Sequence, residues 1–336
     1  MKAKAVALLS GGLDSTLAVK MMIEQGLDVH CLNFVTPFCC CSAKRRSCGN
    51  EAKRVADEFG VKIKIISLGM EYIDIVRNPK HGYGRNLNPC IDCRIFMHKK
   101  AKEYMEEIGA SFIITGEVLE QRPMSQRRDS LNLIDKESGL KGYVLRPLSA
   151  GHFEPTVSEK DGTVDRGKLL KINGRSRKEQ MSLAEELNVG DYPCPGGGCL
   201  LTDVNFARRL RDLFEHQGKV TLNDINLLKV GRHFRIIQES KFITGRMETE
   251  NSTLDSLAKP HDFLFMPVNC QGPTGLLRGK ASEDIINLCA RINARYCDNT
   301  NGDKIKIVFW EKGADEEKKE MLISPLEKEK IEDYLI

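Results

Sequence analysis

The chain has 336 residues, of which 41% are hydrophobic and 29% are charged, and its mean hydropathy is −0.34. This is the balance of a soluble globular protein of roughly two domains, and it excludes a disordered chain, a fibrous chain and a peptide hormone. Lys and Arg number 51 against 47 Asp and Glu, so the net charge of +4 does not by itself indicate a polyanionic partner. No apolar run is long enough to span a bilayer, and glycines follow the first apolar run too early for a signal peptide. We therefore expect a cytoplasmic protein with no membrane partner.

The first third of the chain alternates between short apolar runs and helical patterns. Strands are predicted over 5–9, 29–34, 61–68 and 111–115, and helices over 13–25, 51–59 and 91–108. Strands that alternate with helices predict right-handed crossovers and an α/β fold with a doubly wound parallel sheet. In such a sheet, ligands bind at the carboxyl ends of the strands.

A polar and basic stretch follows from Glu120 to Lys141, and we expect it to be a loop over the site. Next comes a second α/β stretch, with a helix from about 176 to 187 that Asn188 is suited to cap. The prolines and glycines of 192–199 exclude regular structure there. Farther on, a basic helix is predicted over 205–216, short strands over 230–275 and one strand over 305–310. We expect a first domain over residues 1–200 and a second, smaller α+β domain over 201–336.

The strongest motif is Ser-Gly-Gly-Leu-Asp-Ser over residues 10–15, between the first predicted strand and helix. Two glycines let the backbone turn tightly with its N–H groups toward an anion, and the helix N-terminus adds positive charge, which predicts a phosphate cradle. The lysine of a Walker loop is absent. Beside a polyphosphate, Asp14 is suited to bind Mg²⁺. The alternative is a plain turn in which Asp14 or Ser15 only caps the helix.

This motif, in this position, resembles the signature of the PP-loop ATP pyrophosphatases, whose fold is HUP-like. The resemblance implies cleavage of ATP to AMP and pyrophosphate. It assigns the pyrophosphate to Ser10, Gly11, Gly12, Asp14 and Ser15. Gly116 resembles the family's strand-end glycine beside the nucleotide, and Asn33 and Phe34 end the second strand, where adenine would lie in this fold. The alternatives are a simple strand end for Gly116 and a core position for Phe34.

The unusual number in the composition is the 12 cysteines. In a long chain without an export signal, thiols held for metal or redox chemistry are expected rather than disulfides. Four stand alone in the sequence and are expected to be buried small hydrophobes: Cys31, Cys270, Cys289 and Cys297. The others form three groups: Cys39, Cys40, Cys41 and Cys48; Cys90 and Cys93; Cys194 and Cys199.

Cys90 and Cys93, in CxxC spacing, open the long helix predicted over 91–108. At a helix N-terminus the dipole is expected to lower the pKa of both thiols, toward the thiolate needed for metal ligation or nucleophilic attack. A redox disulfide, half of a zinc site and two ligands of an iron–sulfur cluster are the alternatives. Cys194 or Cys199 is expected to supply a third ligand, because the surrounding prolines and glycines would hold that loop close to another site.

The segment NPCIDC over 88–93 resembles the tRNA thiouridylases of the PP-loop superfamily, in which an Asn-Pro segment with a cysteine begins the equivalent helix. Cys93 matches the first catalytic cysteine of that family, and Cys90 stands where relatives often have aspartate. Cys90, Cys93 and Cys194 are similar to the set of three-cysteine members that hold an oxygen-sensitive [4Fe-4S] cluster. Cys199 competes for the third place, and structural zinc is the alternative. The resemblance implies that catalysis rests on Asp14, Cys90, Cys93 and Cys194.

The group from Cys39 to Cys48 has no equivalent in the usual family pattern. It is compatible with a second metal site or with a relay that passes persulfide sulfur, although adjacent thiols cannot all face one ion without strain. Arg146, in an Arg-Pro-Leu segment, is a candidate to pair with a phosphate, with a surface ion pair as the alternative.

Two C-terminal segments, 230–234 and 245–251, resemble the RNA-binding domain of NFACT proteins. That resemblance implies contact with tRNA, and a basic helical face precedes these segments. The candidate contacts are Arg208, Arg209, Arg232, His233 and Arg246. The alternative is a structural β-rich appendage.

Together, these resemblances imply an ATP-dependent tRNA sulfurtransferase. A uridine carbonyl is a poor electrophile, so adenylation by ATP with Mg²⁺ would activate it, and sulfur from a sulfide or persulfide carrier would then displace AMP. The base must leave the RNA stack to be reached, which favours a loop nucleotide. One alternative is a PP-loop enzyme that adenylates a small molecule for sulfur or nitrogen transfer. The other is a nucleotide-gated RNA-binding factor without chemistry.

Overall fold

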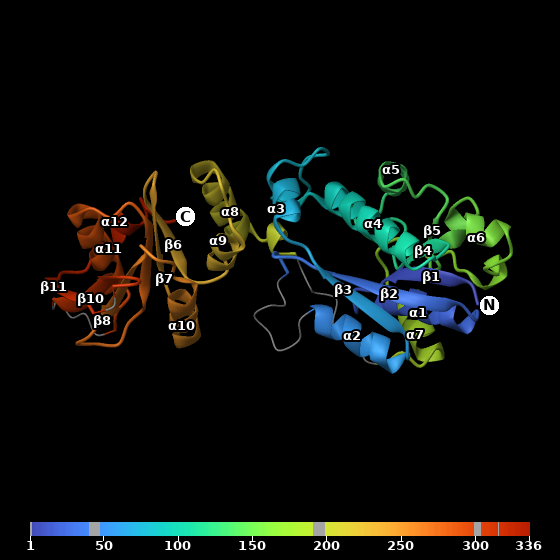
Figure 1. Ribbon diagram of the computed structural model, residues 1–336, viewed down its shortest axis with the longest axis horizontal. Helices are drawn as coiled ribbons and strands as arrows, with labels where there is room; N and C mark the ends of the chain where they lie inside the picture. The colour runs from blue at the N-terminus through green and yellow to red at the C-terminus, as the bar shows by residue number, and fades with distance from the viewer. Residues whose placement is uncertain (1, 40–47, 191–198, 299–303, 315) are drawn as a thin grey trace. The chain divides into compact units, whose positions relative to one another are not determined.

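The computed structural model of the protein describes residues 2–39, 48–190, 199–298, 304–314 and 316–336. The chain divides into two compact units, Met1–Thr202 (unit 1) and Asp203–Ile336 (unit 2), each with its own sheet (Figure 1). Among the helices within these described ranges, none is long and apolar enough to cross a membrane.

Unit 1 contains a five-stranded parallel sheet in the order β3-β2-β1-β4-β5. Its strands are β1 (Lys4–Leu8), β2 (Asp28–Val35), β3 (Lys62–Ser67), β4 (Phe112–Thr115) and β5 (Val144–Leu145). Its helices are α1 (Leu13–Glu24), α2 (Cys48–Glu58), α3 (Met70–Arg77), α4 (Cys90–Glu107), α5 (Arg128–Glu137), α6 (Val157–Lys160) and α7 (Lys178–Glu186). This architecture confirms the expected doubly wound α/β fold.

Helices cover both faces of the parallel sheet (Figure 1). On one face, Ala5 and Ala7 of β1 belong to a core that also includes side chains of α1, α2 and α7. On the other face, Val6 packs in a second core with Ala101 of α4. A strand buried on both faces must be apolar at every position, which explains the continuous Ala-Val-Ala-Leu run at the start of the chain.

The strand order reverses between β1 and β4, so that β2 and β3 lie on one side of β1 and β4 and β5 on the other. The register places Leu8 of β1 opposite Leu32 on one side and Thr115 on the other. The turns after β1 and β4 therefore begin at the same level of the sheet. Reversal points of this kind leave a crevice at the carboxyl ends of the strands, where ligands bind.

Three helices of unit 1 were not predicted, namely α3, α5 and the short α6, and one predicted cap is confirmed. Helix α5 occupies much of the stretch expected to be a loop, because Leu131 and Ile134 form a narrow buried face within a polar sequence. Helix α3 lies between the third strand and the cysteine helix. After α7, Asn188 adopts a left-handed conformation with φ 53°, as expected for a residue that ends a helix.

Unit 2 contains a six-stranded antiparallel sheet in the order β11-β10-β8-β9-β7-β6. Its strands are β6 (Arg232–Ile237), β7 (Ser240–Thr244), β8 (Phe263–Pro267), β9 (Gly275–Gly279), β10 (Ile305–Glu311) and β11 (Lys319–Ile323). Its helices are α8 (Val204–His216), α9 (Leu222–Leu227), α10 (Glu248–Leu257), α11 (Glu283–Arg295) and α12 (Lys328–Ile331). The expected second α+β domain is present, with α10 inserted among the predicted short strands.

Aromatic side chains form the centre of unit 2. The rings of Phe242 and Phe265 meet edge to face with centroids 5.4 Å apart, and Phe309 stacks on Phe265 at 5.9 Å. These rings share a core with α11, whereas Ile243 and Trp310 belong to a second core with α9 and α10. Both faces of the antiparallel sheet are therefore covered.

Candidate functional site

Residues 10–15, here called the signature turn, connect β1 to α1 at the point where the strand order reverses. Gly11 has φ 78°, and a Cβ at this position would lie 2.8 Å from the Cβ of Glu51, so the turn requires glycine. Gly12 is the N-cap of α1 and makes no side-chain cap. The N-cap residue therefore has no side chain that could bind the first N–H groups of the helix. Such N–H groups are suited to bind an anion.

Asp14 and Ser15 do not act as simple caps of α1. The hydroxyls of Ser10 and Ser15 lie 3.0 Å apart, and the Ser15 hydroxyl accepts the N–H of Ser10 at 3.2 Å. Oδ1 of Asp14 is buried and has no hydrogen-bond partner among the described residues, while Oδ2 lies 3.8 Å from Arg177. Burial raises the pKa of Asp14 and Arg177 opposes that shift. A buried carboxylate oxygen without a partner fits a cation such as Mg²⁺.

The end of β4 touches the signature turn. A Cβ on Gly116 would lie 2.5 Å from the carbonyl carbon of Asp14 and 2.5 Å from the backbone nitrogen of Ser15. A strand terminus that merely tolerated glycine would show no such contact, so Gly116 is required for the close approach of the two loops.

The two candidates at the end of β2 have different environments. The Asn33 amide donates to the carbonyl of Leu9 at 2.7 Å, and its Oδ1 is buried without a partner among the described residues. Phe34 is half-buried and packs beside the core that includes Val6 and Ala101. Asn33 therefore has an acceptor available for a ligand, whereas Phe34 contributes at least partly to the core.

Three buried glutamines were not predicted as site residues, and two of them, Gln121 and Gln180, lie beside Asp14 of the signature turn. Gln180 of α7 is fully buried, and neither of its amide atoms has a hydrogen-bond partner in the described parts of the chain. Gln121 Nε2 and Gln126 Oε1 are also buried and unpaired there. Gln121 and Gln180 both lie close enough to Asp14 to influence its carboxyl. Buried amides without partners are costly, so a polar ligand that pairs with them would be stabilised.

Two arginines from different segments, Arg122 and Arg177, lie beside Asp14, and a third, Arg94, lies beside Arg122. Arg122 interacts with Asp14, with Arg94 and with Arg177, and burial together with Arg94 lowers the pKa of its guanidinium. Arg94 follows Cys93 on α4, and Arg177 is the N-cap of α7. Positive charge in excess of the local carboxylates suits the phosphates of a nucleotide.

Arg146 forms ion pairs, as one sequence-based alternative expected, but it is buried and does not lie at the surface. It is 4% exposed, donates to Glu117 at 3.1 Å, and makes a bidentate pair with Asp135 at 2.8 and 2.9 Å. Arg94 lies 3.8 Å from the same Glu117. The ion pairs connect the end of β4 to α4, the helix that carries Cys90, and to α5.

Backbone hydrogen bonds bring three cysteine-bearing segments together. The N–H of Leu200 donates to the carbonyl of Phe38 at 2.9 Å, which places Cys39 opposite Cys199 in an isolated antiparallel bridge. The N–H of Leu87, just before α4, donates to Leu201 at 3.1 Å. The cysteines of these segments that the structure describes form one thiol cluster: Cys39, Cys90, Cys93 and Cys199.

The thiols of this cluster are not activated by the helix dipole as expected. Burial raises the pKa of Cys90 and Cys93, because loss of solvation outweighs the helix terminus and Arg94. Burial likewise raises the pKa of Cys199 to about 12. Tyr72 of α3, which was not predicted, donates a hydrogen bond to Sγ of Cys93 at 3.1 Å.

The structure leaves the ligand set for a metal open. Cys194, Cys40 and Cys41 lie outside the described residues, and Cys48 begins α2. Within the described ranges, no three Cys, His, Asp or Glu side chains are arranged to hold a metal ion. The [4Fe-4S] cluster and its zinc alternative therefore stay predictions. Of the isolated cysteines, Cys31, Cys289 and Cys297 are buried as expected, and Cys270 is half-buried: these four are outside the thiol cluster.

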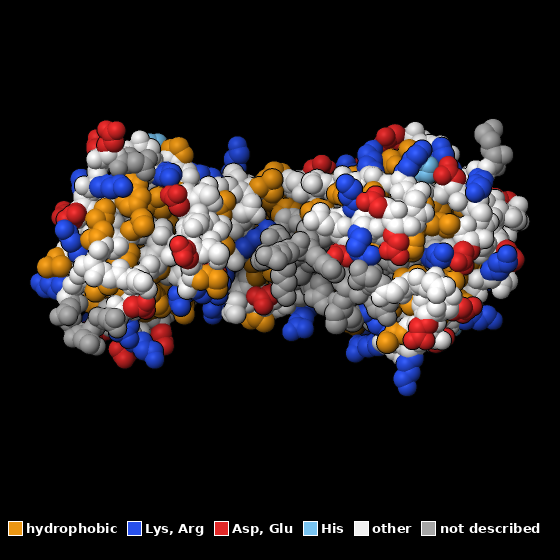
Figure 2. Space-filling view, turned by 90° about the horizontal axis from the view of Figure 1, so that it is seen from below, with side chains coloured by type: hydrophobic (Ala, Val, Ile, Leu, Met, Phe, Trp, Pro, Cys, Tyr) orange, Lys and Arg blue, Asp and Glu red, His pale blue; other side chains and the backbone are white. Residues whose placement is uncertain are grey.

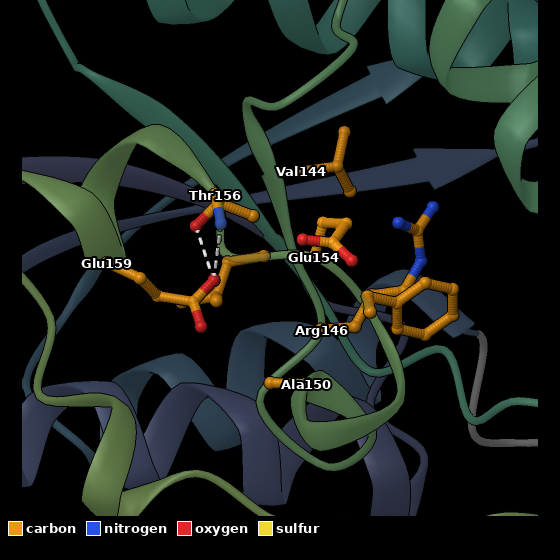
Figure 3. A pocket seen from close by; sticks show the side chains of 8 residues that line it. Val144, Arg146, Ala150, Glu154, Thr156 and Glu159 are labelled. Atoms are coloured by element: carbon orange, nitrogen blue, oxygen red, sulfur yellow. Dashed lines mark hydrogen bonds between the residues drawn. The ribbon is translucent and has the colours of Figure 1, made fainter.

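A small pocket lies elsewhere in unit 1, beside β5 and the start of α6 (Figure 3). Thr156 donates to Glu159 at 2.7 Å from both its backbone N–H and its hydroxyl, and the guanidinium of Arg146 lies 5.4 Å from the ring of Phe153. Neither the signature turn nor the thiol cluster lines this pocket. It is separate from the candidate nucleotide site.

In unit 2, the basic candidates on α8 differ in exposure. Arg208 is exposed, whereas Arg209 is half-buried and donates to the carbonyl of Leu228 at 3.1 Å. Burial lowers the pKa of Arg209, and the nearby Arg246 lowers it further. Figure 2 shows basic and acidic side chains mixed over one face, in keeping with the small net charge.

The candidates on and beside β6 are held by neighbouring groups. The guanidinium of Arg232 lies 4.4 Å from the ring of Tyr296, and Arg246 pairs with Glu250 at 2.5 Å. His233 is fully buried, with Nε2 2.8 Å from the carbonyl of Val230. Its ring therefore belongs to the interior of unit 2, and the prediction that His233 contacts tRNA is not supported. The arginines remain the candidate contacts.

Comparison with known families confirms both resemblances. Residues 1–154 match the family described as thiamine biosynthesis protein (ThiI), and residues 231–335 match the NFACT protein RNA binding domain. Unit 1 thus contains a ThiI-family PP-loop domain, and unit 2 contains an NFACT-type domain.

Several curated relatives are named tRNA-specific 2-thiouridylase MnmA. The protein of Pseudomonas fluorescens (strain Pf0-1) is 28% identical over 246 residues, 69% of this chain and 61% of the relative. That of Proteus mirabilis (strain HI4320) is 30% identical over 198 residues, 55% of this chain and 49% of the relative. The protein of Marinobacter nauticus is 28% identical over an alignment of 344 residues, which covers 91% of this chain and 84% of the relative. The chain thus spans less than two thirds of the length of the first two relatives.

Solved structures show partial likeness. A 4-thiouridine synthetase in complex with RNA and ATP has a TM-score of 0.36 at 22% identity, covering 56% of this chain and 52% of that one. The U34-tRNA thiolase NcsA of Methanococcus maripaludis with its [4Fe-4S] cluster has a TM-score of 0.32 at 18% identity. The match covers 65% of this chain and 68% of that one. The C-terminal part of a Streptococcus suis fibronectin/fibrinogen-binding protein has a TM-score of 0.28 at 13% identity, covering 47% and 77%.

Proposed function

Because unit 1 contains a ThiI-family PP-loop domain and unit 2 an NFACT-type RNA-binding domain, we propose that the protein is an ATP-dependent tRNA sulfurtransferase. It would adenylate a uridine carbonyl and replace its oxygen with sulfur. One observation carries the proposal: the signature turn lies in the same unit as the thiol cluster, and Asp14 Oδ1 and the Gln180 amide are buried there with no hydrogen-bond partner among the described residues. Arg122, which interacts with both Asp14 and Cys90, relates the two halves of the site.

The first half of the site would bind ATP. The glycine turn and the start of α1 would offer backbone N–H groups to the pyrophosphate, and the left-handed Gly11 and the N-cap Gly12 are compatible with this role. Asp14 would hold Mg²⁺, which neutralises phosphate charge. Arg122 and Arg177 lie beside Asp14 and would stabilise the charge that develops at the α-phosphate.

Activation of the base then follows from the chemistry of the carbonyl. The uridine oxygen attacks the α-phosphorus, the bond to the bridging oxygen breaks, and pyrophosphate leaves. A sulfur nucleophile next attacks the activated carbon, and AMP leaves with the former carbonyl oxygen. The target base must be unstacked to enter the site, and unit 2 would hold the tRNA through its exposed arginines.

The thiol cluster would handle the sulfur. Soft thiolates suit iron–sulfur clusters and zinc, and we assign Cys90 and Cys93 as two ligands of a [4Fe-4S] cluster, with Cys194 or Cys199 as the third. When bound, such a cluster with three protein ligands supplies an open iron for sulfide. The described thiols alone do not complete a ligand set, and the tRNA-binding and adenylation steps do not depend on the cluster.

The experiment that tests the proposal measures both halves of the reaction. Nucleosides from the tRNA of a gene-deletion strain are compared with wild type by mass spectrometry, and loss of one thiouridine is expected. ATP labelled at the α-phosphate should yield AMP only when tRNA is present, and Asp14→Asn should abolish the product. Unchanged nucleosides in the deletion strain would refute the proposal.

The same assays separate the alternatives. A PP-loop enzyme with a small-molecule substrate would form AMP without tRNA, and a nucleotide-gated RNA-binding factor would form none under any condition. Iron and acid-labile sulfide in anaerobically purified protein, and their loss in Cys93→Ala, are expected for the cluster. Zinc without iron would remove the cluster and leave the ATP site unaffected.

A further inference from the structure

Gln180 is a polar side chain on the buried face of a helix. It lies one turn before Ala184 on α7, and these two are the buried residues of that helix. Ala184 packs in the apolar core that also contains Leu17 of α1. An apolar side chain at position 180 would extend this core, so the packing of α7 gives no reason for an amide there.

The amide of Gln180 has no hydrogen-bond partner in the described parts of the chain. The residue is 0% exposed, and neither Oε1 nor Nε2 makes a hydrogen bond there. A buried amide without partners destabilises a fold, because it has lost its hydrogen bonds to water and gained none in return. The position of Gln180 therefore indicates a ligand that supplies the missing partners.

The surroundings of Gln180 show where that ligand would lie. Arg177, the N-cap of α7, lies 3.8 Å from Oδ2 of Asp14, which brings the start of α7 to the signature turn. Burial raises the pKa of Asp14, and Gln180 is among the groups that oppose this shift, so its amide approaches the carboxyl as a donor. No hydrogen bond joins the two side chains, and Oδ1 of Asp14 is itself buried and unpaired among the described residues. Two neighbouring side chains thus leave three polar atoms unpaired at the start of α1.

The unpaired atoms need different partners. Nε2 of Gln180 is a donor and the neighbouring carboxylate of Asp14 is an acceptor, so a small movement of either side chain completes that pair. Oε1 of Gln180 is an acceptor, which neither a carboxylate nor a deprotonated phosphate can satisfy, and no described arginine donates to it. Water bound to a divalent cation is a donor, and Mg²⁺ keeps several waters when carboxylates and phosphates bind it. A hydrated cation beside Asp14 would therefore satisfy both Oδ1 and Oε1.

We propose that Gln180 is a positioning residue for the hydrated cation that accompanies a bound nucleotide. Its Nε2 donates to the Asp14 carboxylate and holds it in the orientation that binds the cation. Its Oε1 accepts a hydrogen bond from a water on that cation. This inference rests on the proposed function, because it requires ATP binding at the signature turn. It adds that unit 1 recognises a complex of cation and polyphosphate, and not the free nucleotide.

This role has a consequence for stability that a structural role does not have. In the ligand-free protein the amide of Gln180 is destabilising, so an apolar side chain of similar length should make the protein more stable. In the complex the same replacement removes two hydrogen bonds, so binding of the nucleotide with its cation should weaken. Opposite effects on stability and on binding are expected for a residue that serves a ligand, whereas a residue that serves the fold should lose stability when it is replaced.

The test uses the full chain and the variant Gln180→Met, which keeps the length of the side chain and removes both polar atoms. In calorimetric melts without ligand, the unfolding transition that responds to nucleotide should move up by about 2–5 °C. Binding of a non-hydrolysable ATP analogue is then measured at increasing Mg²⁺ concentration. The Mg²⁺ concentration for half-maximal binding should rise roughly tenfold, and the affinity for the analogue in EDTA should stay within about twofold of wild type.

The controls match the variant in chemistry and in place. Gln238→Met makes the same substitution at an exposed position of unit 2, and Ser182→Ala changes an exposed residue of α7. Both should keep the Mg²⁺ dependence of the wild type. Gln180→Leu repeats the test with a shorter and branched apolar side chain, and it should shift both measurements in the same directions as Gln180→Met.

Three outcomes would overturn the inference: a ligand-free melting temperature that falls in both apolar variants, failure of both to fold, or a Mg²⁺ dependence that stays as in the wild type. Failure here and failure of the proposed function are distinguishable, because these measurements involve no tRNA. Wild-type protein that bound no analogue at any Mg²⁺ concentration would overturn the nucleotide site and the role of Gln180 together. The expected results for Gln180, with unchanged tRNA nucleosides in the deletion strain, would overturn only the sulfurtransferase.

Discussion

The hydroxyl of Tyr72 donates a hydrogen bond to Sγ of Cys93 over 3.1 Å, although the two residues belong to different helices. Tyr72 is 1% exposed, and its ring lies 6.0 Å from that of Phe38, next to Cys39. Burial, with Cys93 and Cys199 nearby, raises the pKa of Tyr72 well above its ordinary value, so the hydroxyl keeps its proton and remains a donor. One tyrosine thus orients the catalytic candidate Cys93 and packs against Phe38, which follows β2.

Replacing this tyrosine should make Cys93 less reactive. Tyr72→Phe keeps the ring but removes a hydrogen bond that favours the thiolate, so the pKa of Cys93, already raised by burial, should rise further. Alkylation of Cys93 by iodoacetamide, followed by mass spectrometry across a pH series, should slow several-fold. The control is Tyr83→Phe, whose hydroxyl donates to the carbonyls of Val76 and Arg77. Equal effects of the two variants, or none, would contradict the role given to Tyr72.

Gly116 should be essential for nucleotide binding. A Cβ there would lie 2.5 Å from backbone atoms of Asp14 and Ser15, which cannot yield as a flexible side chain would. Gly116→Ala should therefore displace the signature turn, cost about 1–3 kcal/mol of stability, and weaken binding of a non-hydrolysable ATP analogue roughly tenfold. Calorimetric titration and thermal unfolding measure the two effects. Gly190→Ala is the control, since a Cβ placed at Gly190 would have no described atom within 4 Å apart from its chain neighbours. Unaltered binding by Gly116→Ala would show that nucleotide binding does not need the close contact between Gly116 and the signature turn.

The sequence was sufficient to predict the signature turn and its place at a strand end, because these features are local. The signature turn is contiguous, its backbone geometry follows from Gly11, and its place after an apolar run defines the strand end. Gly116 was also found from the sequence, although only the structure explains it, through its contact with Asp14.

The residues that complete the site could not be predicted for a physical reason. Arg122 lies in the stretch that was expected to be a loop over the site, and Gln180 lies on a predicted helix, but no local pattern singles out either residue or Tyr72. Only packing brings these side chains to Cys93 or Asp14. Helix α5 was missed because its buried face is too narrow within a polar sequence. The prediction for the cysteine pKa values failed because the helix dipole is a local property, whereas desolvation depends on the whole fold.

Exposed arginines of α8 should contribute to RNA affinity through phosphates. Arg208 is exposed and lies on the same helix as Arg209, and Arg209 lies near Arg246. Arg208→Gln should weaken binding of tRNA and of unrelated RNA alike, and should lower the slope of log affinity against log salt by about 0.7–0.9 per lost phosphate contact. Filter binding across a salt series measures both. Lys328→Gln, an exposed charge on α12, is the control; an unchanged slope in Arg208→Gln would exclude Arg208 from the interface.

The buried ion pairs around Glu117 should make the stability of unit 1 depend on acid pH. Burial alone would raise the pKa of Glu117, but Arg146 and Arg94 outweigh it and lower the pKa to about 2, from an ordinary value of 4.5. A carboxyl with a depressed folded-state pKa stabilises the fold fully above its unfolded pKa, and this stabilisation is lost as pH falls from about 4.5 toward 2. The difference corresponds to about 3 kcal/mol of unfolding free energy at neutral pH.

Glu117→Gln should therefore destabilise unit 1 by about 3 kcal/mol or more at pH 7, because Arg146 stays buried with one partner fewer, and the deficit should shrink as pH falls toward 2. Urea unfolding followed by far-ultraviolet circular dichroism measures the change in the full chain. The single tryptophan, Trp310, lies in unit 2 and reports that unit separately by fluorescence. Glu137→Gln, which breaks a more exposed pair with Lys80, should change little. A deficit in Glu117→Gln that stayed constant from pH 7 to pH 2 would show that Glu117 is not charged in the folded protein.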